Sequence, residues 1–246
     1  MIALNDAVLA ACIMAAAILY ASVGHAGASA YIAAMALFGV PPETMRPTAL
    51  VLNILVAILV ATRFLRAGLF RWRLLWPFMI AAVPAAYIGG GIILPTHIYR
   101  PIVGLVLWFA AWRLLSPSST AADGPTRDPP IPGAMLVGAG IGLLSGLTGT
   151  GGGIFLSPVL ILMRWAPPKM ASGVAAVFIL GNSIAGLAGN IGAVQHLPPQ
   201  LPLFIGAALV GAALGTILGI KLRAQWVTRA LGIVLVIAGA KMIGVY

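Results

Sequence analysis

Charged side chains are scarce in this chain: of its 246 residues, only four are acidic, and 7% are charged in total. Hydrophobic residues make up 61%. A soluble domain needs more charge than this to cover its surface, so the composition excludes a soluble protein. It predicts instead an all-α polytopic membrane protein embedded in the lipid bilayer.

The chain also has a single cysteine, Cys12, and three histidines. One cysteine excludes an internal disulfide and a cysteine-metal cluster, and the separated histidines form no metal-ligand set. No nucleophile with a neighbouring base falls within the apolar runs, so we expect neither an enzyme nor a cofactor. The acidic residues lie outside the predicted spans, whereas a cation pathway would use carboxylates inside the membrane. This favours an anion as the transported solute.

Basic residues, by contrast, give the chain a formal net charge of +10. In a soluble protein such an excess would suggest a nucleic-acid partner. Here the basic residues flank apolar runs, as the positive-inside rule describes, so we predict no nucleic-acid binding. The start of the chain, Met1 to Asp6, lacks the basic region of a signal peptide, and we interpret the first apolar run as retained structure.

The most informative stretch is rich in glycine and runs from Leu147 to Pro158. It lies between two apolar runs, Ala134–Leu147 and Ile154–Met163, each of which we expect to be too short to cross a bilayer alone. Glycine is costly inside a helix, so four glycines in five positions predict a helix break at membrane depth. Free backbone N–H groups at such a break are tolerated only where they line a cavity or bind a ligand.

A weaker copy of this arrangement lies near the start of the chain. The segment Val23–Ser29 separates an apolar run over Leu4–Tyr20 from a short run over Ala30–Phe38. The polar, proline-rich stretch 116–132 then divides the chain nearly in half. We therefore predict a first membrane repeat over 1–115, a linker over 116–132 and a second membrane repeat over 133–246.

Each repeat is predicted to hold one glycine-broken segment followed by three transmembrane helices. The predicted spans are Thr48–Thr62, Leu74–Leu94 and Ile98–Leu115 in the first repeat, and Ala171–Val194, Leu201–Ile220 and Val227–Val245 in the second. If the broken segments crossed the membrane, the fourteen basic residues would divide seven and seven between the two sides. If each is a re-entrant hairpin, eleven lie on one side and three on the other.

The second distribution satisfies the positive-inside rule. We therefore predict two inverted repeats, each a glycine-broken re-entrant helical hairpin plus three transmembrane helices. Both termini are expected outside the cell membrane and the linker in the cytoplasm. In transporters of this kind the substrate lies near the midplane, where half-helix N-termini favour an anion.

The candidate substrate-binding residues lie at the two breaks and on the helices that follow them: Ser22, Gly24, His25, Gly27, Ser29, Asn53, Thr148, Gly149, Thr150, Gly151, Gly152, Gly153 and Asn182. His25 is a candidate for binding the anion or for carrying a proton. Each has a structural alternative. Glycines permit close helix packing, His25 could be a hydrogen-bonded packing residue, and Asn53 and Asn182 could join helices. Arg46, just before a span, could attract substrate or hold a plain interface position.

The residues also resemble a known family. Gly149-Thr-Gly-Gly-Gly-Ile-Phe-Leu-Ser-Pro158, followed by Pro167-Pro168 and Met170-Ala-Ser-Gly, is similar to the glycine-rich signature of the sulfite exporter TauE/SafE family. In the first repeat, His25-Ala-Gly-Ala28 replaces the usual run of glycines. The resemblance implies a duplicated membrane protein of this length that moves sulfur-containing anions such as sulfite, sulfoacetate or related organosulfonates.

The sequence therefore predicts a secondary transporter in the cell inner membrane, an exporter of a small sulfur-containing oxyanion. The anion would bind between the two hairpin tips and be exposed to each side in turn. An anion channel and a non-transporting membrane scaffold are the alternatives. The sequence does not determine the direction of transport, the coupling ion or the oligomeric state.

Overall fold

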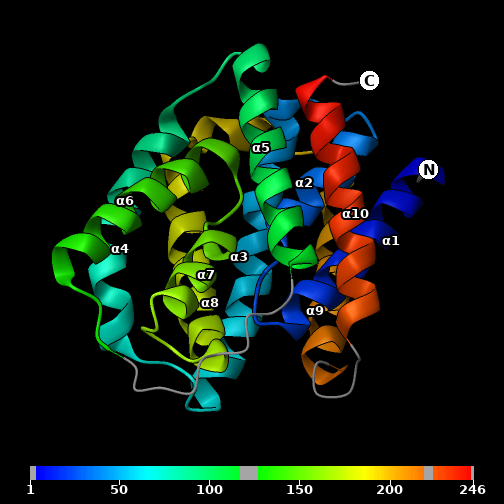
Figure 1. Ribbon diagram of the computed structural model, residues 1–246. Helices are drawn as coiled ribbons and strands as arrows, with labels where there is room; N and C mark the ends of the chain where they lie inside the picture. The colour runs from blue at the N-terminus through cyan, green and yellow to red at the C-terminus, as the bar shows by residue number, and fades with distance from the viewer. Residues whose placement is uncertain (1–3, 117–126, 219–223, 245–246) are drawn as a thin grey trace.

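The computed structural model describes residues 4–116, 127–218 and 224–244, and within these ranges every regular element is a helix (Figure 1). The predicted all-helical class is confirmed. Among the described residues, five helices are long and apolar enough to cross a membrane: α1, α3, α4, α6 and α8.

The elements of the first half are α1 (Leu4–Ser22), α2 (Ala28–Leu37), α3 (Pro42–Arg66), α4 (Trp72–Gly91) and α5 (Thr96–Leu115). Those of the second half are α6 (Ile131–Thr148), α7 (Gly153–Leu162), α8 (Pro168–Gly189), the 3-10 helix η1 (Ile191–His196), α9 (Leu201–Leu218) and α10 (Ala224–Ile243). Helix breaks therefore lie between α1 and α2 and between α6 and α7, inside the two predicted segments.

The longer limb of each broken segment corrects one expectation. With 19 and 18 residues, α1 and α6 are each long enough to cross a membrane, so the prediction that Ala134–Leu147 is too short was wrong. Helix α6 begins at Ile131, within the predicted linker, because Pro132 is tolerated in the first helical turn. Residues 117–126 of that linker lie outside the described residues, as do Lys221 and Arg223.

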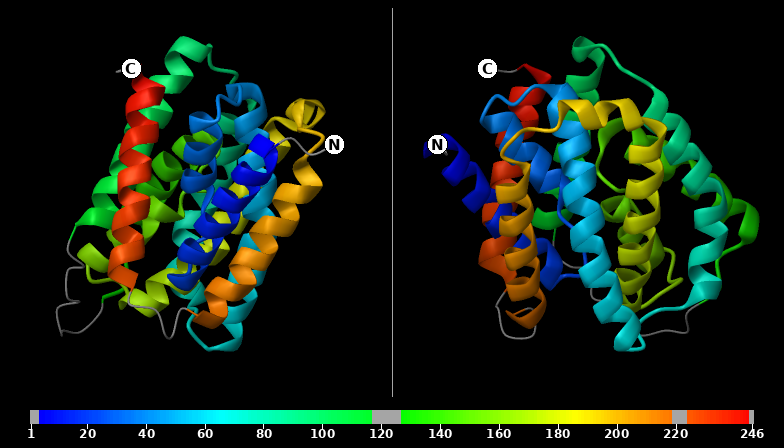
Figure 2. Two further views of the ribbon diagram at one scale, coloured as in Figure 1. Left: turned by 90° about the vertical axis from the view of Figure 1, so that its right-hand side faces the viewer. Right: turned by 180° about the vertical axis from the view of Figure 1, so that it is seen from behind.

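The directions of the helices can be followed in Figures 1 and 2. Both described chain ends lie towards the same end of the molecule, called here the upper end, and α2 runs back towards it after α1 descends. Helix α6 ascends from the opposite, lower end, and α7 runs back down. Helix α3 then runs the length of the molecule from the upper end to the lower end.

The two halves of the sequence are interleaved in space. Helix α4 packs against α6 and α8, and α7 packs against α8, which makes a four-helix unit called here the α4 group. In the same way α9 packs against α1 and α3, and α2 packs against α3, which makes the α9 group. Each group combines three helices of one half with one helix of the other. The groups meet where α3 packs against α8, and α5 packs against α10 beside them.

Small residues allow the backbones within each group to approach closely. Along α6, glycines four residues apart face carbonyl oxygens of α4, so that a Cβ added at Gly142 would overlap the carbonyl of Ala82. A Cβ at Gly215 of α9 would likewise overlap the carbonyl of Ile18 in α1. Lipid provides no hydrophobic drive between helices, so close van der Waals packing of this kind stabilises their association.

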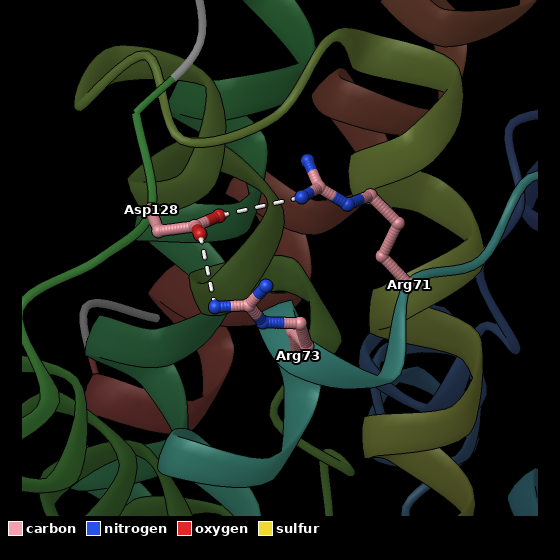
Figure 3. Close-up of polar contacts among 3 residues, drawn as sticks. All are labelled: Arg71, Arg73 and Asp128. Carbon is pink, nitrogen blue, oxygen red and sulfur yellow. Dashed lines mark hydrogen bonds and ion pairs between the residues drawn. The ribbon is translucent and has the colours of Figure 1, made fainter.

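An ion-pair cluster marks the lower end. Asp128, just before α6, lies between Arg71 and Arg73 at the start of α4, 3.4 Å and 4.0 Å from their Nη2 atoms (Figure 3). All three side chains are largely exposed, so the cluster contributes at most about 1 kcal/mol to stability.

Candidate functional site

The second break is built from glycines in a conformation that other residues avoid. Gly149, Gly151 and Gly152 have φ angles of +84°, +76° and +79°, in the left-handed region. A side chain at any of these positions would be strained, and at Gly151 it would also overlap Asn53. The glycine run in the sequence therefore follows from the shape of this turn.

This shape leaves backbone donors free inside the protein. The Gly149 N–H donates to the Ser145 carbonyl, 2.8 Å away, and the next bonded amide is that of Phe155. Among the described residues, the amides of 150–154 have no acceptor, although residues 150–153 are buried. They form the N-terminal end of α7, where the helix dipole adds a partial positive charge. Amides of this kind can donate to an anion, and residues 150–154 are called here the nest.

Asn53 of α3 contacts this nest from the other half of the chain. Its Nδ2 donates to the Ser183 Oγ of α8, 3.1 Å away, and lies 3.5 Å from the Thr150 carbonyl. Its Oδ1 has no partner among the described residues, although the side chain is fully buried. The predicted role of Asn53 as a residue that faces the break thus matches its position.

Other buried polar groups near the bonded pair also lack partners in the described part of the chain. They are the hydroxyls of Thr48 and Ser145 and both polar atoms of Asn182, each on a residue with 0% exposure. An unpaired buried polar group costs about 1–3 kcal/mol. Several of them on α3, α6 and α8 are therefore expected to have a function, such as binding a ligand.

The first break reaches the second through His25. Its Nε2 lies 2.9 Å from the Ser157 Oγ of α7, and its Nδ1 lies 3.3 Å from the Val23 carbonyl. A Cβ built on Gly153 would lie 3.5 Å from the His25 Cδ2. The two breaks, more than a hundred residues apart in sequence, are thus in direct contact.

Several predicted site residues serve their own segment instead. The Ser22 hydroxyl donates to the Leu19 carbonyl of the same helix, and Ser29 is hydrogen-bonded to the Tyr20 hydroxyl at 2.7 Å. Gly27, with φ +100°, begins α2 and lies against the ring of Tyr31. The contacts of these three residues lie within the first break, and their predicted role in binding stays a prediction.

Thr148, Thr150 and Gly152 lie at the second break, whereas Gly24 lies in the first. The Thr148 hydroxyl donates to the Leu144 carbonyl and lies 3.0 Å from that of Thr150. A Cβ at Gly152 would lie 3.0 Å from the ring of Phe178, and Gly24, with φ +83°, lies against Ser172 of α8.

Two residues of the site were not among the predicted ones. Ser183 lies beside Asn182 in the sequence, and only the packing of α3 on α8 shows that Ser183 is the one that faces Asn53. Arg46 was expected before a span, but it lies inside α3 and is 6% exposed. The span was predicted to begin at Thr48, whereas the helix already starts at Pro42.

Two cavities open at opposite ends of α3. The lower cavity, about 640 Å³, is lined by residues at the ends of α1 and α3 and the start of α8, including Ser22, Phe64 and Ser172. The upper cavity, about 520 Å³, is lined by the start of α3, the start of α5 and η1, including Arg46, Tyr99 and His196. Asn53 lies between them along α3, about 10 Å from Arg46.

No group of three His, Cys, Asp or Glu side chains in the described part of the chain could hold a metal ion. The site is instead composed of backbone amides, two amide side chains, hydroxyls and one imidazole. Such a set can donate several hydrogen bonds to one small anion.

Two comparisons relate the chain to known proteins. Residues 9–242 match the family described as Sulfite exporter TauE/SafE. The chain is 39% identical over 232 residues to a protein described as probable membrane transporter protein y4hK of Sinorhizobium fredii (strain NBRC 101917 / NGR234). The match covers 92% of this chain and 94% of that protein. No solved structure matches at a significant level.

Proposed function

We propose that this chain, which belongs to the sulfite exporter TauE/SafE family, exports a small sulfur-containing oxyanion such as sulfite or an organosulfonate. It is a multi-pass membrane transporter, as its family and its relative indicate. In the proposed mechanism the anion binds where the two breaks meet and is exposed to each side of the membrane in turn.

One observation carries the proposal: the unpaired amides of 150–154 at the N-terminal end of α7, of which residues 150–153 are buried. An oxyanion presents several acceptor oxygens, which these amides can bind without a cationic side chain. Asn53, Ser183 and His25 surround the same turn and supply further polar atoms. Because an imidazole can take up and release a proton, His25 is also the proposed carrier if transport is coupled to protons.

The arrangement of the cavities supports alternating access over a channel. The nest is enclosed, since Asn53 and Ser183 are fully buried. Val23 of the first break lines the lower cavity, and Arg46 of the upper cavity contacts Gly149 of the second break. Gly24, Phe64 and Ser172 close the route from the lower cavity. Gly149, Arg46 and Tyr99 close it from the upper cavity. A channel would keep both routes open together.

We further propose that the moving bodies are the α4 group and the α9 group. The nest belongs to the α4 group, whereas Asn53 and His25 belong to the α9 group. A shift along the contact of α3 with α8 would therefore open the route from one cavity to the nest while the route from the other cavity stays closed. Each moving body contains helices from both predicted repeats. In this proposal the repeats are inverted, and each has a re-entrant hairpin.

The distribution of basic residues suggests the orientation. The connections at the lower end carry Arg63, Arg66, Arg71, Arg73, Arg127, Arg164 and Lys169, and Arg113 lies at the end of α5 that faces them. The upper end carries Arg46, Arg100 and Lys241. By the positive-inside rule the lower end, with the linker, faces the cytoplasm and both termini face outward.

Counterflow in proteoliposomes tests the function. Vesicles preloaded with sulfite should accumulate [³⁵S]sulfite, and uptake should saturate. Asn53→Asp, which is nearly isosteric but adds a negative charge, should lower uptake at least about tenfold through like-charge repulsion. Asn5→Asp, at the exposed start of α1, is the matched control and should leave uptake unchanged.

Three results would contradict the proposal. Uptake that does not saturate and ignores the opposite gradient would indicate a channel. Thermal stability unaffected by sulfite, sulfate, thiosulfate, sulfonates or carboxylates would indicate a scaffold. Wild-type uptake by Asn53→Asp would place the anion elsewhere.

A further inference from the structure

We infer that the upper cavity is a second anion-binding site, built on the buried guanidinium of Arg46 and separate from the nest at the break. The inference rests on the proposed function for its choice of anion, an oxyanion such as sulfite. It does not require that the nest itself binds that anion.

Arg46 carries a buried charge without a counter-ion. The guanidinium donates to the carbonyls of Ile92, 3.0 Å away, and Gly89, 2.8 Å away, and also to that of Gly90. No carboxylate in the described part of the chain forms an ion pair with it. The carbonyls at the C-terminal end of α4 hold the cation in place, but they do not cancel its charge.

The cavity beside Arg46 has room for an anion and further groups to hold it. Its volume, about 520 Å³, is in the range of small-molecule sites. The Nε of Arg46 is buried and has no partner among the described residues, so the guanidinium keeps one unused donor. Thr96, Asn190 and His196 also line the cavity. The one carboxylate in the wall, Glu43, is exposed on the first turn of α3 and forms no ion pair in the described structure.

The lower cavity provides a comparison within the same molecule. Pro41 precedes α3 and Pro167 precedes α8, and Arg46 and Ser172 are each the fifth residue after that proline. Each contacts the first left-handed glycine of the break in the other half: Gly149 for Arg46, Gly24 for Ser172. At this position the lower cavity has a neutral hydroxyl and the upper cavity a buried cation, whereas the two basic residues that line the lower cavity, Arg63 and Lys169, are not buried. The anion site is therefore assigned to the upper cavity.

An anion in this cavity would lie against the second break. A Cβ at Gly149 would lie 3.2 Å from the Cγ of Arg46, and the Tyr99 hydroxyl donates to the Thr148 carbonyl, 3.2 Å away. An anion that attracts the guanidinium would compete with the α4 carbonyls for its donors. The cavity thus gives the transported anion a second binding site at one end of its route, next to the contacts that must open for transport.

Binding stoichiometry with [³⁵S]sulfite on purified full-length protein tests the inference. The wild-type chain should bind two anions, and Arg46→Met and Asn53→Asp should each bind one. Arg46→Lys keeps the charge but loses the planar fork, so it should bind two, one of them about tenfold more weakly. Arg63→Met, in the lower cavity, is the matched control and should bind two with wild-type affinity.

The variants separate the two proposals. If the wild-type chain binds one anion, and Asn53→Asp still binds it while Arg46→Met does not, the nest fails and the Arg46 site stands. Two anions on Arg46→Met with unchanged affinity would overturn the inference. If Arg46→Met does not fold, Arg46→Lys decides, because two wild-type affinities in that variant would equally overturn it.

Discussion

The two helix breaks occupy corresponding places in the two halves but offer different chemistry. In the first break the amides of Val23, Gly24 and His25 all donate to carbonyls at the end of α1. In the second, the amides of 150–154 have no acceptor among the described residues. The amides of 26–29 in the first break also have no acceptor among the described residues, and residues 26–29 are buried. The two breaks therefore differ in their side chains: the first contains His25, whereas the second is a run of glycines.

This difference gives the two breaks complementary roles in the proposed mechanism. In that mechanism, free backbone amides hold the anion but cannot change their own charge, whereas a histidine can. The 2.9 Å contact between His25 and Ser157 brings the histidine next to the second break.

The largest expected effect comes from adding a side chain at the second break. Gly151→Ala should reduce transport at least about a hundredfold, because the new Cβ overlaps Asn53 and displaces the nest. Gly39→Ala is the matched control, since Gly39 has φ +75° but no atom within 4 Å of its Cβ position. The control should lose about 1 kcal/mol of stability and keep its transport. Equal transport losses would mean that backbone strain, not the site, explains the glycine.

Removal of the His25 side chain in the first break should have a smaller effect. His25→Ala should lower transport about tenfold, because the hydrogen bond to Ser157 is lost, and should flatten the dependence of transport on pH. Proteoliposome uptake measured from pH 5 to pH 8 checks both. The exposed His97→Ala serves as control. A pH profile of His25→Ala identical to that of the wild type would make His25 a packing residue.

Asn182 distinguishes a ligand-binding amide from structural glue. Neither of its polar atoms has a partner in the described structure, so Asn182→Leu should raise the stability of the anion-free protein by about 1 kcal/mol. The same change should reduce the thermal shift that sulfite produces. Thermal unfolding with and without sulfite measures both. A destabilised variant with a normal sulfite shift would show that Asn182 joins helices.

The smallest effect is expected far from both breaks. Asp128→Ala removes the exposed ion pairs with Arg71 and Arg73, and should cost less than about 1 kcal/mol of stability. Transport should not change. A large loss of uptake would show that the lower end takes part in the movement of the α4 group.

Much of the fold was readable from the sequence. Low charge and long apolar runs predict membrane helices, and the breaks fall where Gly149 to Gly153 and Gly24 to Gly27 predict them. The helix ends were less accurate, because prolines such as Pro42 and Pro132 begin helices instead of preceding them. Orientation in the membrane and the re-entrant, inverted character of the repeats stay predictions.

The candidate site was predictable only in part. Clustered glycines and a lone histidine between apolar runs are visible in a sequence, so the two breaks could be predicted. Ser183 could not, since its relevance depends on which face of α8 meets α3. Arg46 could not either, because an arginine near a span end looks the same whether it faces water or is buried against α4.

By itself, the sequence determined the helical membrane class, the positions of the two breaks and the family, because these depend on local composition and local backbone preference. Only the tertiary structure decided that α4 joins the helices of the second half, that α9 joins those of the first, and that the breaks touch. The physical reason is that helices in lipid have no hydrophobic pattern to direct their pairing. Their partners are chosen by the fit of small residues against distant backbones, which no single stretch of sequence contains.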